Sequence, residues 1–287
     1  MWAIIFSAGL ATTPVFSMPA FAQGPALVSE NLQQMTYEVY AGGINAVSAK
    51  LKVDYADKKD NYSLEVSAQT KGLLGKLAPW EGTFETKGWH LKDGKEVPEL
   101  HRSTATWRDE KEIKTYEYGK DGSFKDYTVV EEGRDKTPQK LDEGLYKDTT
   151  DALTATLEVM KSVADKGECE GAEEVFDGNR RYKLVFSHGE QERLESSRYN
   201  IYDGESVRCE VEVQPISGAW HKKPRGWMSI QEQGRDKGSL PTVWFAKIDE
   251  DGPAVPVKIR VKTDYGTLFM HLVDYKNGGQ AIKMAED

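Results

Sequence analysis

Apolar and polar residues alternate along most of the chain from Thr36 onward, a pattern typical of strands with one buried face. Turn-forming Asp-Gly pairs, such as Asp121-Gly122 and Asp203-Gly204, separate these segments. The number of turns predicts an antiparallel sheet of roughly ten or more strands. Because so wide a sheet tends to curl or close, we predict a mainly β protein with a large curved antiparallel sheet, an open barrel or a spiral. The clearest alternating runs are Ala49–Tyr55, Tyr62–Ala68, Tyr182–Phe186, Val255–Val261 and Leu268–Leu272.

One segment, from Asp148 to Gly167, has the spacing of an amphipathic helix instead. Thr149 or Thr150 is expected to cap its start, and Gly167 to end it. We expect the curved sheet to wrap this one long α-helix. A helix that merely joins two halves of the sheet would bury the same residues. The apolar face consists of Leu153, Leu157, Met160 and Ala164.

The first 22 residues have the character of a signal peptide. Residues 3–22 carry no charge, and Ala20-Phe21-Ala22 matches the small-residue site that signal peptidase cuts. We therefore predict cleavage after Ala22, which leaves residues 23–287 as a single β-rich domain in the periplasm. The alternative is an apolar anchor that stays attached. No later segment approaches the ~18 apolar residues of a transmembrane helix, so the protein is expected to be peripheral to the membrane at most.

The chain has two cysteines, Cys169 and Cys209. After a signal peptide, an even pair of cysteines indicates a disulfide bond. Cys209 alternates with Val207, Val211 and Val213, which places its sulfur on an apolar strand face. A buried bridge fits this position, and closing a loop of this length stabilises the fold by roughly 4 kcal/mol on the chain-entropy model.

Charge and motifs narrow the function classes. The chain carries 38 Lys and Arg against 47 Asp and Glu, a net charge of −9, which argues against a nucleic-acid partner. It holds no nucleophile elbow, phosphate loop or dinucleotide fingerprint, and its five histidines are scattered without metal-ligand spacing. We therefore name no catalytic residue, no metal site and no cofactor. Carboxylates are abundant, but the sequence singles out no acid/base pair.

An apolar, glycine-bearing stretch from Gly72 to Trp80 lies between two polar strands. Its residues are expected to line a cavity or form the lip of a groove. The alternative is a strand connection whose leucines plug the sheet. Two further tryptophans on strand-like runs face either the same groove or the core. The candidate ligand-binding residues are Leu73, Leu74, Leu77, Trp80, Trp89 and Trp107.

A family resemblance rests on turn residues and cysteine positions spread along the chain. Its marks are Tyr37 with Gly42-Gly43, Gly72-Leu73 with Pro79-Trp80, Cys169, Asp177-Gly178 with Arg180-Arg181-Tyr182, Tyr202 with Gly204, Cys209, and Pro215-Ile216 with Gly218 and Trp220. Over roughly residues 34 to 275 the chain resembles the bacterial domain of unknown function 3108. The resemblance implies an exported Gram-negative envelope protein without an assigned reaction. Its general architecture is also similar to periplasmic lipoprotein carriers, whose curved sheet holds acyl chains against a helix.

These observations favour a non-enzymatic periplasmic cell-envelope protein. We expect it to bind a lipid, a lipoprotein acyl chain or an extended peptide in an apolar cleft and to support envelope integrity. A second hypothesis is a structural or scaffold protein that binds other envelope proteins through exposed strand edges. A third is an enzyme that acts on an envelope polymer through paired carboxylates. The sequence does not define the ligand, the partner or the oligomeric state.

Overall fold

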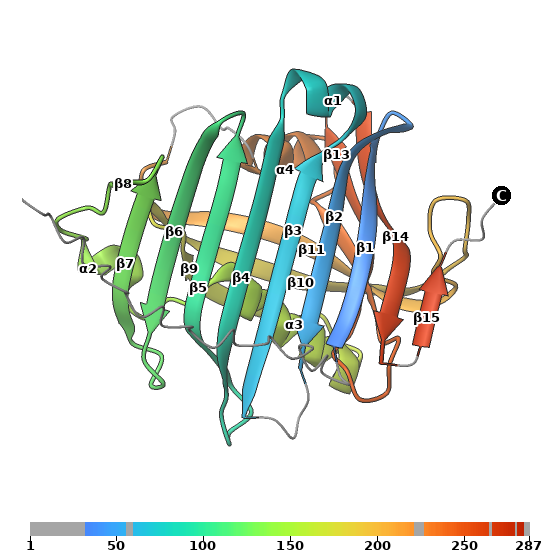
Figure 1. The fold of residues 1–287 in the computed structure, drawn as a ribbon. Helices are drawn as coiled ribbons and strands as arrows, with labels where there is room; N and C mark the ends of the chain where they lie inside the picture. Colours follow the sequence, from blue (N-terminus) through green and yellow to red (C-terminus); the bar gives the residue numbers. More distant parts are fainter. Residues whose placement is uncertain (1–31, 56–59, 221–226, 264–265, 279, 284–287) are drawn as a thin grey trace, which may run out of the picture.

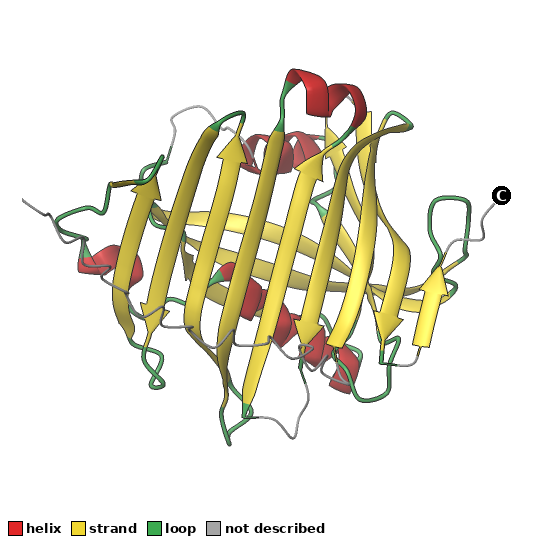
Figure 2. Ribbon diagram, viewed as in Figure 1, coloured by secondary structure: helices red, strands yellow, loops and turns green. Residues whose placement is uncertain are grey.

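The computed structural model describes residues 32–55, 60–220, 227–263, 266–278 and 280–283, and the predicted signal peptide, residues 1–22, lies outside them. One antiparallel sheet of 15 strands dominates these residues (Figures 1 and 2). This confirms the prediction of a mainly β protein built on a large antiparallel sheet. The strands are β1 (Leu32–Ala41), β2 (Ile44–Asp54), β3 (Asn61–Thr70), β4 (Trp80–His90), β5 (Glu96–Trp107), β6 (Glu110–Tyr118), β7 (Phe124–Glu131), β8 (Arg134–Asp135), β9 (Gly171–Phe176), β10 (Arg180–Leu194), β11 (Gly204–Gly218), β12 (Thr242–Ala246), β13 (Val255–Thr263), β14 (Gly266–Asn277) and β15 (Gln280–Lys283).

The sheet consists of two meanders that meet at the first strand of the chain. Strands β1 to β8 pair in sequence order and form the first meander, and β9 to β14 pair in sequence order and form the second. The two meanders join where β1 pairs with β14, for example Tyr37 with Leu272, while β15 pairs with β14. Tyr37 also lies opposite Ala49 of β2, so β1 has a partner strand on each side. A pairing between residues so far apart in sequence makes one continuous sheet.

Helix α3 (Ala152–Lys166) connects the two meanders and packs between them. It contacts β4 and β5 of the first meander and β9, β10 and β12 of the second (Figure 1). Leu157 and Met160 of the predicted apolar face are buried, and Leu153 and Ala164 pack against the same core. The helix therefore packs against strands of both meanders and occupies the space between them.

The ends of α3 follow from local chemistry, with one correction to the sequence prediction. Asp151, not Thr149 or Thr150, is the N-cap, and its carboxylate accepts hydrogen bonds from the amides of Leu153 and Thr154 at 2.9 and 3.2 Å. A carboxylate at this position satisfies two amides that the helix leaves unpaired, and it interacts favourably with the helix dipole. Gly167 ends the helix with a φ of 69°, as predicted.

Three shorter helices were not singled out in the sequence, because each is too short or too polar for a periodic signal. None of the helices in the described part of the chain combines the length and apolarity that crossing a bilayer requires. The three are α1 (Gly72–Leu77), α2 (Glu143–Tyr146) and α4 (Trp227–Asp236).

Cys169 and Cys209 form the predicted disulfide, with a sulfur–sulfur distance of 2.07 Å. Cys169 follows the end of α3, and Cys209 lies on β11, so the bond ties the helix end to the second meander. Val207 and Val211 are buried on the same strand face, as the alternation predicted. Such a bond is typical of proteins that mature in an oxidising compartment.

A second, aromatic core cluster joins the far ends of the two meanders. Tyr116 of β6 and Tyr127 of β7 pack against Phe176 of β9, with ring centroids 6.0 and 5.7 Å away. The Gly178 turn approaches so closely that a Cβ there would collide with the Tyr127 hydroxyl. The first and second meanders therefore contact each other through side chains here as well as through α3.

Candidate functional site

An apolar pocket lies between α3 and strands β10 to β13, with a volume of about 530 Å³. Its walls are the alternating side chains that face α3, and the buried ones include Leu184, Phe186 and Val211. The pocket is lined by Ala152, Thr156, Asp177, Arg180, Tyr182, Leu184, Phe186, Val211, Val213, Trp220, Met228, Val243, Phe245, Pro256 and Ile259. Its volume and mainly apolar lining are those of small-molecule and lipid sites.

The pocket exists because α3 offers small side chains to the second meander. Only Ala152 and Thr156 of the helix line it, and they lie one turn apart on the same helix face. Opposite them, Leu184 pairs with Val213 and Phe186 with Val211 across neighbouring strands. Small residues on the helix and branched or aromatic residues on the sheet leave a gap that the side chains of the described residues do not fill.

A second pocket of about 380 Å³ adjoins the first, toward the first meander. One row across strands β3 to β6 forms its sheet wall, in the order Val66, Phe84, Ser103 and Lys114. The two pockets share four lining residues and so are neighbours in the same interior space. The shared residues are Ala152, Asp177, Arg180 and Tyr182. We call the two pockets together the interior cleft.

A polar clasp lies where the two pockets meet. The Arg180 guanidinium donates to the Asp177 carboxylate at 2.8 Å. The same guanidinium lies over the Trp220 ring, 4.9 Å from its centroid, and Tyr182 packs edge-on against that ring. Burial raises the pKa of Tyr182, so its hydroxyl stays protonated and neutral. The cleft thus combines apolar walls with one charged and aromatic border.

The Asp151 carboxylate anchors the start of α3 to the first meander. Besides the two capping amides, it accepts hydrogen bonds from the hydroxyls of Thr86 and Thr154 at 2.7 and 2.5 Å, and His101 lies 3.3 Å away. Burial alone would raise the pKa of Asp151, but His101 and the two hydroxyls outweigh it and lower the pKa to about 2. The Tyr62 hydroxyl extends the network by donating to Thr154 at 2.7 Å. A fully satisfied buried anion of this kind fixes the helix position.

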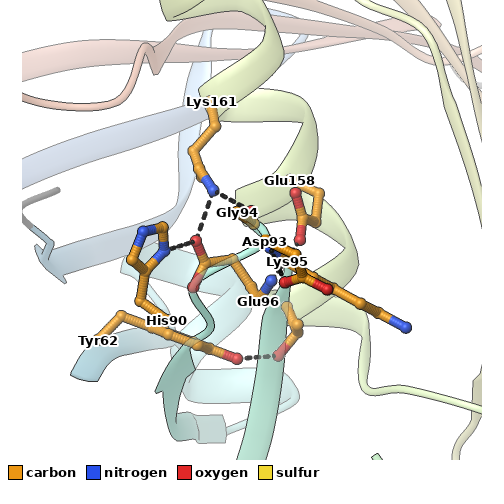
Figure 3. A network of polar contacts seen from close by, with 9 residues as sticks. Tyr62, His90, Asp93, Gly94, Lys95, Glu96, Glu158 and Lys161 are labelled. Atoms are coloured by element: carbon orange, nitrogen blue, oxygen red, sulfur yellow. Dashed lines mark hydrogen bonds and ion pairs between the residues drawn. The ribbon is translucent and has the colours of Figure 1, made fainter. Parts of the chain in front are cut away.

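A second buried network, shown in Figure 3, anchors the middle of α3 to the same sheet side. The Glu96 carboxylate accepts from the Lys161 ammonium at 2.5 Å and lies 2.7 Å from His90 Nδ1. Lys161 also donates to the carbonyl of Gly94 at 2.9 Å, and the Glu158 carboxylate accepts from the Glu96 amide at 2.7 Å. Burial raises the pKa of Glu158. These contacts bind the helix to the β4–β5 hairpin.

The family of the chain follows from a comparison with known proteins. A family model described as a protein of unknown function, DUF3108, matches residues 36–273. The chain belongs to the DUF3108 family. The DUF3108 match runs from β1 to β14, and it confirms the resemblance that the turn and cysteine positions indicated.

Other comparisons add one structural likeness. The crystal structure of a beta-barrel-like protein of domain of unknown function DUF1849 from Brucella abortus is similar to this DUF3108 chain, with a TM-score of 0.48 and 12% sequence identity. The likeness covers 88% of this chain and 100% of that one. No curated protein matches the sequence.

The six residues proposed from sequence for ligand binding lie outside the interior cleft. Leu73 and Leu77 on α1 are 66% and 68% exposed, and Leu74 beside them is 40% exposed. Trp107 is 48% exposed and pairs with the half-buried Trp80, while Trp89 is half-buried on β4. None of the six lines either pocket of the cleft. The three leucines neither plug the sheet nor face the cleft, because α1 turns them toward solvent.

The cleft residues themselves were identified in sequence only as strand residues. Tyr182, Leu184 and Phe186 form one of the alternating runs, but the pattern does not say whether another side chain covers them. The small pair Ala152 and Thr156 is a usable signal, since small residues one turn apart mark a helix face that leaves room. In the described part of the chain, no group of three or more His, Cys, Asp or Glu residues is placed to hold a metal ion.

Proposed function

We propose that this protein is a non-enzymatic, exported protein of the periplasm that binds the acyl chain of a lipid or lipoprotein in the interior cleft. One observation carries the proposal: an apolar pocket of about 530 Å³ remains open between α3 and the second meander. Apolar surface left unfilled in an otherwise close-packed interior costs stability, since interiors normally lack voids of this size. An acyl chain would restore those contacts.

Three features support an amphiphile with an acyl chain as the ligand. The pocket wall is aliphatic and aromatic, which suits a hydrocarbon chain. The Arg180–Asp177 clasp and Trp220 form a polar and aromatic border on the same cleft, which suits the polar end of such a molecule. The neighbouring pocket continues the space toward Ser103 and Lys114, so the ligand need not end at the clasp.

The test uses full-length protein secreted by a Gram-negative host and analysed by native mass spectrometry with lipid extraction. Wild type is expected to carry a bound lipid, and dansyl-undecanoic acid is expected to replace it with a rise in fluorescence. Ala152→Phe introduces a ring at one of the four residues that both pockets share, so it is expected to lower probe binding at least tenfold. Ala281→Phe on the exposed strand β15 is the matched control and keeps full binding.

Two results would contradict the proposal. One is wild-type protein that neither retains a lipid nor binds the probe. The other is equal probe binding by the Ala152→Phe and Ala281→Phe variants, both with wild-type unfolding midpoints. Either outcome would favour a scaffold that binds protein partners, which cross-linking in intact cells would then detect.

A further inference from the structure

Five of the seven exposed large apolar residues in the described part of the chain gather at one end of the first meander. Helix α1 projects beyond the ends of β3 and β4, at the top of Figure 1, next to the turn between β1 and β2. Leu73 and Leu77 on α1 and Ile44 at that turn are each about two-thirds exposed, with Leu74 and Trp107 less so. We call Ile44, Leu73, Leu74, Leu77 and Trp107 the apolar tip.

Backbone contacts show that the segments carrying these residues are neighbours. The Lys71 amide donates to the Ala46 carbonyl at 2.8 Å, which ties the start of α1 to β2. The Arg108 amide donates to the Pro79 carbonyl at 2.9 Å, which ties the end of the α1 segment to the residue after Trp107. The β1–β2 turn, α1 and the end of β5 are therefore contiguous.

The α1 segment is firmly built, so the exposure of its leucines is a property of the fold. The Thr70 hydroxyl donates to the Ala78 carbonyl at 3.1 Å and accepts from the Trp80 amide at 2.9 Å, which closes the segment at its base. A Cβ at Gly75 would lie 2.9 Å from the Thr70 carbonyl oxygen, so the helix packs directly on the strand end. Exposing several leucines to water is unfavourable, so a rigid segment that holds them outward indicates a binding surface.

The leucine-bearing part of the tip differs in charge from the whole chain. The chain has a net charge of −9, yet residues 41–46 and 71–79 contain two lysines, Lys71 and Lys76, and no Asp or Glu, while Glu110 lies opposite Trp107 at the edge of the tip. Lys71 lies 4.0 Å from the Glu38 carboxylate, while Lys76 lies in the last turn of α1 between the exposed leucines. Leucines that enter the hydrocarbon, a lysine that reaches the headgroups and a tryptophan at the border are the chemistry of an anionic bilayer surface.

We propose that the apolar tip docks the protein reversibly on the surface of an anionic phospholipid bilayer. The tip consists of residues that do not line the interior cleft, so the proposal is independent of cleft binding. Leu73, Leu77 and Ile44 insert at the level of the upper acyl chains, and Lys76 contacts lipid phosphates.

The test is co-sedimentation of the full chain, after export, with vesicles of phosphatidylglycerol and phosphatidylcholine. Wild type is expected to bind. The Leu73→Asp/Leu77→Asp variant is expected to lower the partition coefficient about tenfold or more, because it loses two apolar side chains that would enter the bilayer. Lys76→Gln is expected to lower it about fivefold on these vesicles and to leave binding to pure phosphatidylcholine unchanged. Ile216→Asp/Ile282→Asp, at two other exposed isoleucines, is the matched control and binds as wild type does.

Each opposite result overturns the proposal. Wild type that stays in the supernatant, or equal binding by the tip and control variants, removes the bilayer as the partner. A photo-cross-linker at position 77 that captures a protein in intact cells, and no lipid, assigns the tip to a protein partner instead. Because all substituted residues are largely exposed, thermal unfolding midpoints of the variants are expected to match wild type. A variant that unfolds early is replaced by Leu73→Ser/Leu77→Ser, which must show the same loss.

Discussion

The two sides of helix α3 contrast in how they meet the sheet. Toward the first meander, Asp151, Thr154, Glu158 and Lys161 form one stripe that makes buried hydrogen bonds and ion pairs with strands β3 to β5 and the β4–β5 hairpin. Toward strands β10 to β13 of the second meander, Ala152 and Thr156 face an open apolar pocket. The same helix is thus fastened to β3–β5 along one stripe and leaves space beside its first turns.

This contrast explains how a β protein keeps an interior cleft without collapsing around it. Nonpolar contacts are not directional, and alone they would let α3 slide toward the open pocket. Buried hydrogen bonds need a defined geometry and cost several kcal/mol when broken, so the polar stripe holds α3 at a fixed distance. The disulfide at Cys169 ties the chain after the helix to β11. Polar side chains therefore position the helix, and small side chains define the cleft.

The largest expected effect comes from removing the anchor at the start of α3. Asp151→Ala leaves Thr86, His101 and the helix amides without their acceptor, so the free energy of unfolding is expected to fall by about 3 to 5 kcal/mol. Asp177→Ala removes a carboxylate on the cleft side, where solvent screens its ion pair, and is expected to cost about 1 kcal/mol. Urea denaturation measures both. Equal losses would show that the two sides of α3 do not differ as described.

The second prediction concerns the loss of folding stability at low pH. Asp151 has a folded-state pKa of about 2 against 3.8 in the unfolded chain, so ionised Asp151 stabilises the folded state above pH 3.8. The contribution of roughly 2 kcal/mol is lost as the pH falls from about 4 toward 2. Urea denaturation of wild type and Asp151→Asn at several pH values isolates this term, because the difference between the two proteins is expected to shrink over that range. A difference that stays constant with pH would contradict the assignment.

The third prediction compares packing on the two sides of α3. A Cβ at Gly88, on the packed side, would collide with the Tyr62 ring and the Val97 carbonyl, so Gly88→Ala is expected to cost about 1 to 3 kcal/mol. Ala152→Phe adds a whole ring on the cleft side and is expected to change stability by less than about 1 kcal/mol, because the space is already open. Thermal and urea unfolding of the two variants compares them directly. A larger loss for Ala152→Phe would mean that the cleft is closed in solution.

Much of the secondary structure could be predicted because it depends on local periodicity. Tyr182, Leu184 and Phe186 alternate as a half-buried strand must, and Leu157 and Met160 recur as a helix face must. The helix start was misplaced by one to two residues because Thr149, Thr150 and Asp151 are all acceptable caps, and only the buried partners of Asp151 favour it. The prediction that the α1 leucines bind a ligand in a cleft required knowing which way their side chains face, and the periodicity of the sequence does not report this.

The sequence by itself determined the class of fold, the position of the long helix and the pairing of two cysteines, because side-chain period and residue type are local properties. Only the tertiary structure decided that β1 pairs with β14, that the space beside Ala152 stays open and that the tip leucines face solvent. Each of these depends on which distant residues share a space. Whether a side chain is buried depends on the distant residues that folding brings next to it, and local sequence patterns do not report those neighbours.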